Sequence, residues 1–114
     1  MFSTLALFED IILSVEVLFQ QHRTALSKTK LKVVLKDQSV IFLREIIIEN
    51  ILFDYSYHWQ NHDNSLIIRW DNAPHYPLLS TFPHHKHVSS EMNVFPSEEQ
   101  SLFTVLNFIN SKLK

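Results

Sequence analysis

The chain of 114 residues contains no cysteine and no glycine. The lack of cysteine excludes disulfide bonds, thiolate nucleophiles and zinc sites with cysteine ligands, and it is typical of a reducing compartment. The lack of glycine means that tight turns must use Asn, Asp, Ser or Pro instead. The turns are therefore expected at four places: Asp37-Gln38, Glu49-Asn50, Asp63-Asn64 and Asp71-Asn72.

The chain also lacks a strong excess of one charge and a long uninterrupted apolar run. Its net charge is -2 with neutral histidines, which argues against a strongly basic nucleic-acid binder but leaves a local basic patch open. Glu9, Asp10 and Glu16 interrupt the apolar N-terminal segment, which has no basic start and no small-residue cleavage site. We therefore expect neither a signal peptide nor a membrane span, and we expect a cytoplasmic protein that binds no membrane.

What the chain has in quantity is apolar residues, at 46%, which is enough for one domain over residues 1–114 with its own core. Apolar periodicity predicts a short helix over about residues 3–12 and a strand over about 14–25, with one continuous helix to about Gln21 as the alternative. Alternating apolar residues then predict further strands, joined by short turns into an antiparallel meander, over about residues 30–36, 39–49, 52–60 and 65–70.

The C-terminal part is predicted to be helical. Residues 93–95 are either a short edge strand or an extended link, and Ser97 and Gln100 have the spacing of a capping box. The apolar stripe of the helix that follows consists of Leu102, Val105, Leu106, Ile109 and Leu113, with Lys112 and Lys114 at its end. The predicted fold is a single α+β domain: a curved antiparallel meander of four to five strands, with a short N-terminal helix and a C-terminal helix packed on the sheet.

The densest group of titratable residues runs from Arg69 to His87. This stretch holds four of the seven histidines and three of the four prolines, together with Asp71 and Lys86. Its prolines predict an irregular segment rather than a helix or a central strand. Loops held on a rigid scaffold commonly carry function, so this stretch is the candidate site.

One hypothesis is metal-independent general acid–base catalysis on RNA. Histidine has a suitable pKa to take the proton of a 2′-hydroxyl and to return one to the leaving oxygen. In this hypothesis His85 and His87 are the acid–base pair, Arg69 and Lys86 bind phosphate, and His75 and Asp71 orient them. No cofactor is required.

Aromatic and basic residues elsewhere offer further contacts to RNA. Tyr57 and Trp70 are candidate stacking faces for bases, along with Tyr55 and Trp59, although core packing is the more ordinary role of aromatic residues in strands. Lysines at 28, 30, 32 and 36 form a basic strip. The strip is either a solvated sheet face or a surface for the phosphate backbone.

Two other interpretations of the stretch remain open. His85 and His87 form a His-x-His pair that could hold a metal ion, with His75 or Asp71 completing the site, although no specific metal motif is matched. Alternatively, the stretch carries no chemistry: either its histidines satisfy loop carbonyls and Asp71-Asn72 closes an Asx-turn, or it is the Pro/His-rich loop of a non-catalytic binding module that docks a protein or nucleic-acid partner.

Four motifs of the chain resemble the TumE family of toxin–antitoxin proteins. They are Tyr55-Ser-Tyr-His-Trp-Gln60, Arg69-Trp-Asp-Asn-Ala-Pro-His75, Phe82-Pro-His-His-Lys-His87 and Pro96-Ser-Glu-Glu99, and the resemblance extends from about Lys30 to the C-terminus. It implies a toxin with a cognate antitoxin, commonly a helix-turn-helix protein encoded beside it. RNA and a second copy of the chain are further expected partners. The family often has a histidine where this chain has Tyr76, and a glycine at the Asp37-Gln38 turn.

Overall fold

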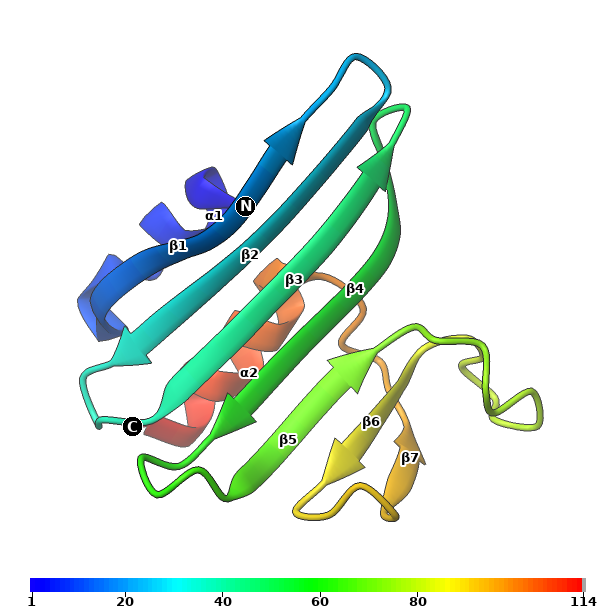
Figure 1. Ribbon diagram of the computed structural model, residues 1–114. Helices are drawn as coiled ribbons and strands as arrows, with labels where there is room; N and C mark the ends of the chain where they lie inside the picture. Colours follow the sequence, from blue (N-terminus) through cyan, green and yellow to red (C-terminus); the bar gives the residue numbers. More distant parts are fainter. Residues whose placement is uncertain (114) are drawn as a thin grey trace.

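The computed structural model describes residues 1–113, so Lys114, predicted to lie at the end of the C-terminal helix, is outside the described residues. The elements follow one another along the chain as shown in Figure 1. They are helix α1 (Phe2–Ala6), the 3-10 turn η1 (Glu9–Ile11), strands β1 (Ile12–His22), β2 (Leu26–Leu35), β3 (Val40–Ile48), β4 (Ile51–Gln60), β5 (Leu66–Asp71), β6 (His85–Val88) and β7 (Val94–Pro96), and helix α2 (Leu102–Leu113).

The strands form one antiparallel sheet in the order of the sequence, β1-β2-β3-β4-β5-β6-β7. The predicted α+β meander is confirmed, but the predicted number of four to five strands is wrong, because the sheet has seven. The two additional strands are β6, which comes from the stretch expected to be irregular, and β7, which decides for the edge strand where the sequence left a strand or an extended link open over residues 93–95. The prolines of that stretch all precede His85, so they leave the four residues of β6 free to pair with β5.

The N-terminal region contains less helix than predicted. Residues 12–22 are strand β1, which agrees with the predicted strand over about 14–25 and excludes the alternative of a continuous helix. Helix α1 ends at Ala6, and a 3-10 turn leads into β1. Leu5, Phe8 and Ile11 of this segment are buried, so it covers the sheet with three apolar side chains.

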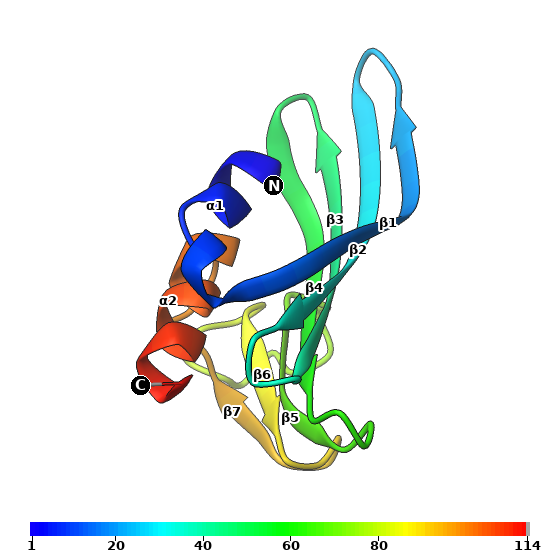
Figure 2. The ribbon, with the colours of Figure 1, turned by 90° about the vertical axis from the view of Figure 1, so that its left-hand side faces the viewer.

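Both helices lie on the same side of the sheet (Figure 2), and the core lies between. Because side chains alternate along a strand, one set faces the helices. This set includes Leu31, Leu43, Tyr57 and Trp70, each at most 1% exposed. Among residues 1–113 no helix lies on the opposite side of the sheet, and we call this side the helix-free face.

Helix α2 begins later than predicted. Its first helical residue is Leu102, and the cap is Ser101, whose Oγ accepts the Thr104 N–H while Thr104 Oγ1 accepts the Ser101 N–H. Ser97, the predicted N-cap, instead donates its hydroxyl to Glu99 O. The predicted apolar stripe is confirmed at the four residues that are buried, Leu102, Val105, Leu106 and Ile109.

Turns without glycine are built in two ways. Three of the predicted turns contain residues with positive φ: Gln38, Glu49 with Asn50, and Asn64. In addition, aspartate side chains close Asx-turns: the Oδ1 atoms of Asp37, Asp63 and Asp71 each accept the backbone N–H two residues later. None of the helices within residues 1–113 is long and apolar enough to cross a membrane.

Candidate active site on the helix-free face

The strand register places polar and charged residues in two rows across the helix-free face. Residues directly opposite one another in an antiparallel sheet share a face and have neighbouring side chains. The first row runs across β2 to β6 and consists of Lys30, Arg44, Ser56, Asp71 and His85. The second row runs beside it and consists of Lys32, Phe42, His58, Arg69 and His87. Both rows begin with a lysine and end with a histidine.

The histidine end of the rows forms the floor of a cleft of about 300 Å³. The lining comes from β3 to β6 and from the segment after β5: Arg44, Ser56, Arg69, Asp71, Ala73, His75, Tyr76, His85 and His87. The sequence therefore predicted five residues that the structure brings together in one cleft, namely Arg69, Asp71, His75, His85 and His87. Their chemical roles stay predictions.

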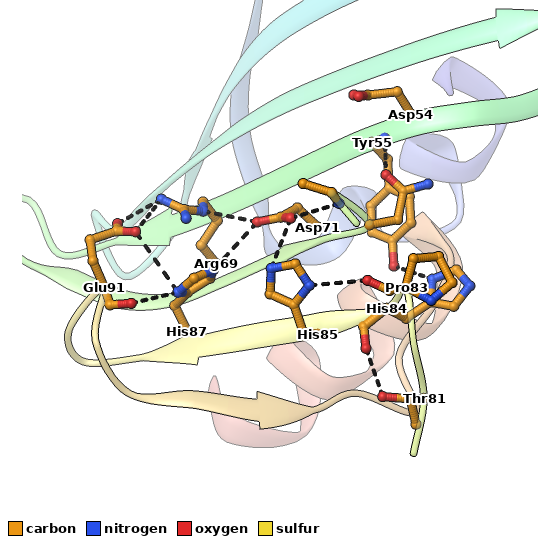
Figure 3. Close-up of polar contacts among 12 residues, drawn as sticks. Asp54, Tyr55, Arg69, Asp71, Thr81, Pro83, His84, His85, His87 and Glu91 are labelled. Atoms are coloured by element: carbon orange, nitrogen blue, oxygen red, sulfur yellow. Dashed lines mark hydrogen bonds and ion pairs between the residues drawn. The ribbon is translucent and has the colours of Figure 1, made fainter. Parts of the chain in front are cut away.

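Asp71, His85 and His87 lie at the centre of the site, and we call them the triad (Figure 3). His85 Nε2 is 3.0 Å from Asp71 Oδ1, and His87 Nε2 is 3.6 Å from Asp71 Oδ2. The two imidazole rings meet edge to face with their centroids 4.9 Å apart. All three side chains are buried, at 7%, 1% and 3% exposure respectively. One ligand atom from each lies within 4.8 Å of the others, so the triad could hold a metal ion.

Backbone carbonyls orient both histidines. His85 Nδ1 donates to Pro83 O at 3.0 Å, and His87 Nδ1 donates to Glu91 O at 2.8 Å. A carbonyl oxygen only accepts, so each Nδ1 carries the proton and each Nε2 is the atom that remains available. The same geometry appears in Figure 3, where both Nε2 atoms point toward Asp71.

Arg69 links the triad to the rim of the cleft. Its Nε lies 3.2 Å from Asp71 Oδ2, and its Nη1 lies 2.6 Å from Glu91 Oε2. The guanidinium therefore bridges a buried and an exposed carboxylate. Burial, together with the Arg69 charge, lowers the pKa of the neighbouring His58. His58 is thus neutral at pH 7 and adds no charge to this face.

The sequence analysis gave no role to three residues that shape the site. Tyr76 packs its ring against His85 with a centroid distance of 4.8 Å, Arg44 lines the cleft and pairs with Asp54 at 2.8 Å, and Glu91 pairs with Arg69. Arg44 had a detectable signal, because it is the one basic residue within the apolar strand β3. Tyr76 lies in the candidate stretch, at a position where the resemblance leads one to expect histidine, and Glu91 had no signal in the sequence.

Three predicted contacts to substrate lie on the wrong side of the sheet. Tyr57 and Trp70 are both 0% exposed and face the helices, so neither could stack on a base. Tyr57 donates its hydroxyl to the Glu45 carboxylate, and burial and that carboxylate raise the pKa of Tyr57 well above its usual range. Lys86 lies opposite Trp70 and pairs with Glu99 at 3.0 Å, so its ammonium does not face the cleft.

The remaining histidine of the stretch lies apart from the triad. His84 Nδ1 is 2.8 Å from the hydroxyl of Tyr55, a buried residue on the side of the sheet that the helices cover. Burial lowers the pKa of His84. His75 is exposed at the rim of the cleft. The prediction of a His-x-His pair on one face of an extended chain therefore holds for His85 and His87, and His84 points the other way.

A comparison with known families identifies the setting of this site. The family profile described as Toxin TumE matches residues 2–113. The chain belongs to the TumE toxin family. The TumE match covers nearly the whole chain, including the N-terminal residues before Lys30 that the resemblance of single motifs did not reach. No curated protein and no solved structure matched in the corresponding comparisons.

Membership of the TumE family makes the chain a toxin of a toxin–antitoxin system, and it implies an antitoxin partner. Two of the motifs that carry the resemblance contain triad residues, Asp71 in one and His85 with His87 in the other. The sheet brings these two motifs together by pairing β5 with β6.

Proposed function

We propose that this toxin acts by cleaving RNA, with the cleft as its active site. The observation that supports the proposal is the pair of rows on the helix-free face, which lead from lysines at one side to the triad at the other. Lys28, Lys30 and Lys32 form no ion pair with any residue among 1–113. They remain free to bind the phosphate backbone, which dominates affinity for nucleic acid.

The proposed reaction is attack of a ribose 2′-oxygen on the adjacent phosphorus. The new bond forms between the 2′-oxygen and phosphorus, the bond from phosphorus to the 5′-oxygen breaks, a base accepts the 2′-hydroxyl proton, and an acid protonates the leaving oxygen. Arg69 and Arg44 line the place where the phosphate would lie and would stabilise its developing charge. Tyr76, which lines the cleft, and Phe42, which lies in the second row, would offer flat apolar contacts to the bases in place of the buried Tyr57 and Trp70.

The metal-independent version of this reaction uses His85 and His87 as the acid–base pair. For it to operate, at least one Nε2 atom must reach a substrate proton. Both Nε2 atoms instead point at the Asp71 carboxylate, and both rings are almost fully buried. This geometry favours the metal-dependent alternative that the sequence left open, with the same residues acting as ligands.

The antitoxin partner is proposed to be a small helix-turn-helix protein encoded beside the toxin gene, as the family resemblance implies. Co-expression of the two genes should relieve any growth arrest, and the two proteins should purify together. The mass of the purified toxin alone, measured by light scattering, tests whether it also forms the homodimer expected from the sequence.

The test of the function compares two histidine variants. Induced expression of the wild-type chain should arrest growth, and the purified protein should cleave RNA. His87→Gln should lower both by about 100-fold or more, which corresponds to about 2.7 kcal/mol of transition-state stabilisation. His62→Gln, in the exposed turn between β4 and β5, should behave as wild type.

Two outcomes would contradict the proposal. Full toxicity of a folded and normally expressed His87→Gln protein would remove the triad from the activity. RNA binding without cleavage by the wild-type protein, at any metal content, would replace catalysis by the function of a binding module.

A further inference from the structure

Three electron-pair donors converge beneath the cleft. Asp71 Oδ1 and Oδ2 lie 3.0 and 3.6 Å from the Nε2 atoms of His85 and His87. Two ligand atoms bound to one metal ion at about 2.1 Å and at angles of 90–110° are separated by roughly 3.0–3.4 Å. The separation between His85 Nε2 and Asp71 Oδ1 lies in this range, and that between His87 Nε2 and Asp71 Oδ2 is slightly larger. One ligand atom from each of the three side chains lies within 4.8 Å of the other two, so a small contraction of the triad would bring all three to the distances of a shared ion.

The hydrogen bonds of the two imidazole rings direct their lone pairs inward. Each Nδ1–H is held by a backbone carbonyl, Pro83 O for His85 and Glu91 O for His87. Histidines that ligate metals almost always donate the other ring N–H to a carbonyl or carboxylate, which fixes the tautomer and the ring orientation. His85 and His87 both donate such a hydrogen bond, and the two accepting carbonyls lie in different segments of the chain.

The Asp71 carboxylate between the two rings is also held in place by hydrogen bonds. Asp71 Oδ1 accepts the Ala73 N–H at 3.0 Å, and Oδ2 lies 3.2 Å from Arg69 Nε. His87 Nε2, in contrast, is fully buried and has no hydrogen-bond partner among residues 1–113. A buried polar nitrogen without a partner is destabilising, and a bound ligand would give this nitrogen its missing partner.

Additional protons on the two rings would not give both Nε2 atoms a hydrogen-bond partner. A proton on His85 Nε2 would let it donate to Asp71 Oδ1, but His87 Nε2 would still lie 3.6 Å from Asp71 Oδ2, beyond hydrogen-bond distance. Protonating both rings would place two cations beside Arg69 in a buried site with a single buried carboxylate. One divalent cation bound to all three side chains satisfies them together.

We propose that Asp71, His85 and His87 bind one divalent first-row transition metal ion, such as Zn²⁺, through the two Nε2 atoms and the carboxylate. Mixed imidazole and carboxylate ligands suit Zn²⁺, Fe²⁺ and related ions, whereas Mg²⁺ and Ca²⁺ prefer oxygen ligands alone. The triad lines the cleft, so an ion held there would have its remaining coordination positions available to a molecule in the cleft. This is the arrangement of a catalytic site, which keeps positions open for substrate.

The role of the metal in catalysis rests on the proposed ribonuclease activity, but its binding does not. In the cleft, the ion would bind a phosphate oxygen and stabilise the charge of the transition state beside Arg69 and Arg44. Arg69, held between Asp71 and Glu91, would keep the carboxylate ligand in place and limit the negative charge of the site.

Binding is tested without RNA. The purified chain is dialysed against EDTA, checked for folding by circular dichroism, and titrated with Zn²⁺ by calorimetry and with Co²⁺ by visible absorption. We expect one ion per chain, a rise in the melting temperature with Zn²⁺, and an affinity that falls more than about 100-fold in His87→Gln. His84→Gln, which removes a neighbouring histidine outside the triad, should bind as wild type.

A second measurement uses the unaltered protein, in case a variant fails to fold. Long-range ¹H–¹⁵N spectra of the histidine side chains should show Zn²⁺ shifting the Nε2 signals of His85 and His87 while their Nδ1 atoms stay protonated. Absence of stoichiometric binding by either ion, or shifts confined to other histidines, would overturn the proposal.

RNA assays then separate the two proposals. Cleavage by the EDTA-treated protein, unaffected by added Zn²⁺ or Mn²⁺, would keep the ribonuclease and overturn the catalytic role of the metal. Triad-dependent metal binding without cleavage of RNA under any condition would confirm the site and overturn the ribonuclease.

Discussion

At the scale of single residues, the absence of glycine has a visible consequence in the turns. Gln38 has φ of 75°, in the left-handed region that glycine favours. A residue with a Cβ atom is destabilised there by about 1–2 kcal/mol, and asparagine tolerates the region better than glutamine. The backbone at Gln38 is therefore strained.

Gln38→Gly should stabilise the protein. The side chain is exposed, and the Gln38 N–H that bonds to Leu35 O is retained in the variant. Relief of the left-handed strain, less the extra freedom that glycine gives the unfolded chain, should raise the free energy of unfolding by about 0.5–1 kcal/mol. Urea denaturation measures this difference.

The control for this change is Asn64→Gly, in a turn residue with φ of 73° that is already suited to the conformation. Its effect should be close to zero. If both variants change stability equally, or if Gln38→Gly is destabilising, then strain at Gln38 is not the cause.

At the scale of elements, one carboxylate joins the sheet to the start of the C-terminal helix. Glu99 Oε1 accepts the Trp70 Nε1–H at 3.1 Å and lies 3.0 Å from Lys86 Nζ, so it connects β5 and β6 to the segment before α2. Burial alone would raise the pKa of Glu99, but the hydrogen bonds from Lys86 and Trp70 and the Lys86 charge outweigh it, and the pKa is lowered from 4.5.

Glu99→Gln should therefore destabilise the protein in a pH-dependent way. Because the folded-state pKa is below the unfolded value of 4.5, the stabilisation by the carboxylate is complete above pH 4.5 and is lost as the pH falls through the folded-state pKa. We expect the variant to lose about 1 kcal/mol at pH 7, and the difference from wild type to shrink below pH 4.5.

Denaturation of both proteins at pH 7, 5 and 3 measures this effect, with Glu98→Gln as the control. Glu98 is adjacent and exposed, so its replacement should leave the stability unchanged at each pH. A Glu99→Gln deficit that persists unchanged at pH 3 would show that packing, rather than the charge, makes the contribution.

The elements also show which parts of the fold follow from sequence. Periodicity identified the meander and the buried stripe of α2, because apolar alternation reports directly on burial. Strand β6 was missed because the prolines led us to expect an irregular segment over the whole of Arg69–His87. The strand begins at His85, after the last of these prolines, Pro83. The N-cap of α2 was predicted at Ser97 and lies at Ser101. Both serines have the sequence pattern of a cap, and the choice between them depends on contacts in the folded protein.

The residues of the site were also predictable only in part. The composition of the stretch pointed to Asp71, His85 and His87, and the His-x-His spacing placed two rings on one face. The sequence could not show which face the helices cover, so Tyr57, Trp70 and Lys86 were assigned to the substrate although they face the core side. It also could not show the carbonyl partners of the rings, which come from Pro83 and from Glu91.

At the scale of the whole molecule, the sheet separates two kinds of surface. The helices cover one face (Figures 1 and 2). The strand register places the basic side chains of β2 on the other face, in the rows that lead to the cleft. The net charge of -2 concealed this separation, because it averages over both sides. A chain that is acidic as a whole can therefore still carry a basic surface on one face.

The last prediction tests this face directly. Lys30→Glu combined with Lys32→Glu should weaken RNA binding by about 10-fold or more and reduce its salt dependence, by about 0.7 in the slope of log K against log salt for each lost phosphate contact. Fluorescence anisotropy with a labelled RNA strand measures both quantities. Lys36→Glu with Lys112→Glu is the matched control, because it changes the net charge equally at the β2–β3 turn and on α2. If both double variants lose affinity equally, the net charge of the molecule governs binding, and the helix-free face is not the RNA surface. If only the first does, the rows of the sheet lead RNA to the triad, since the same register that aligns Lys30 with Arg44 aligns Asp71 with His85.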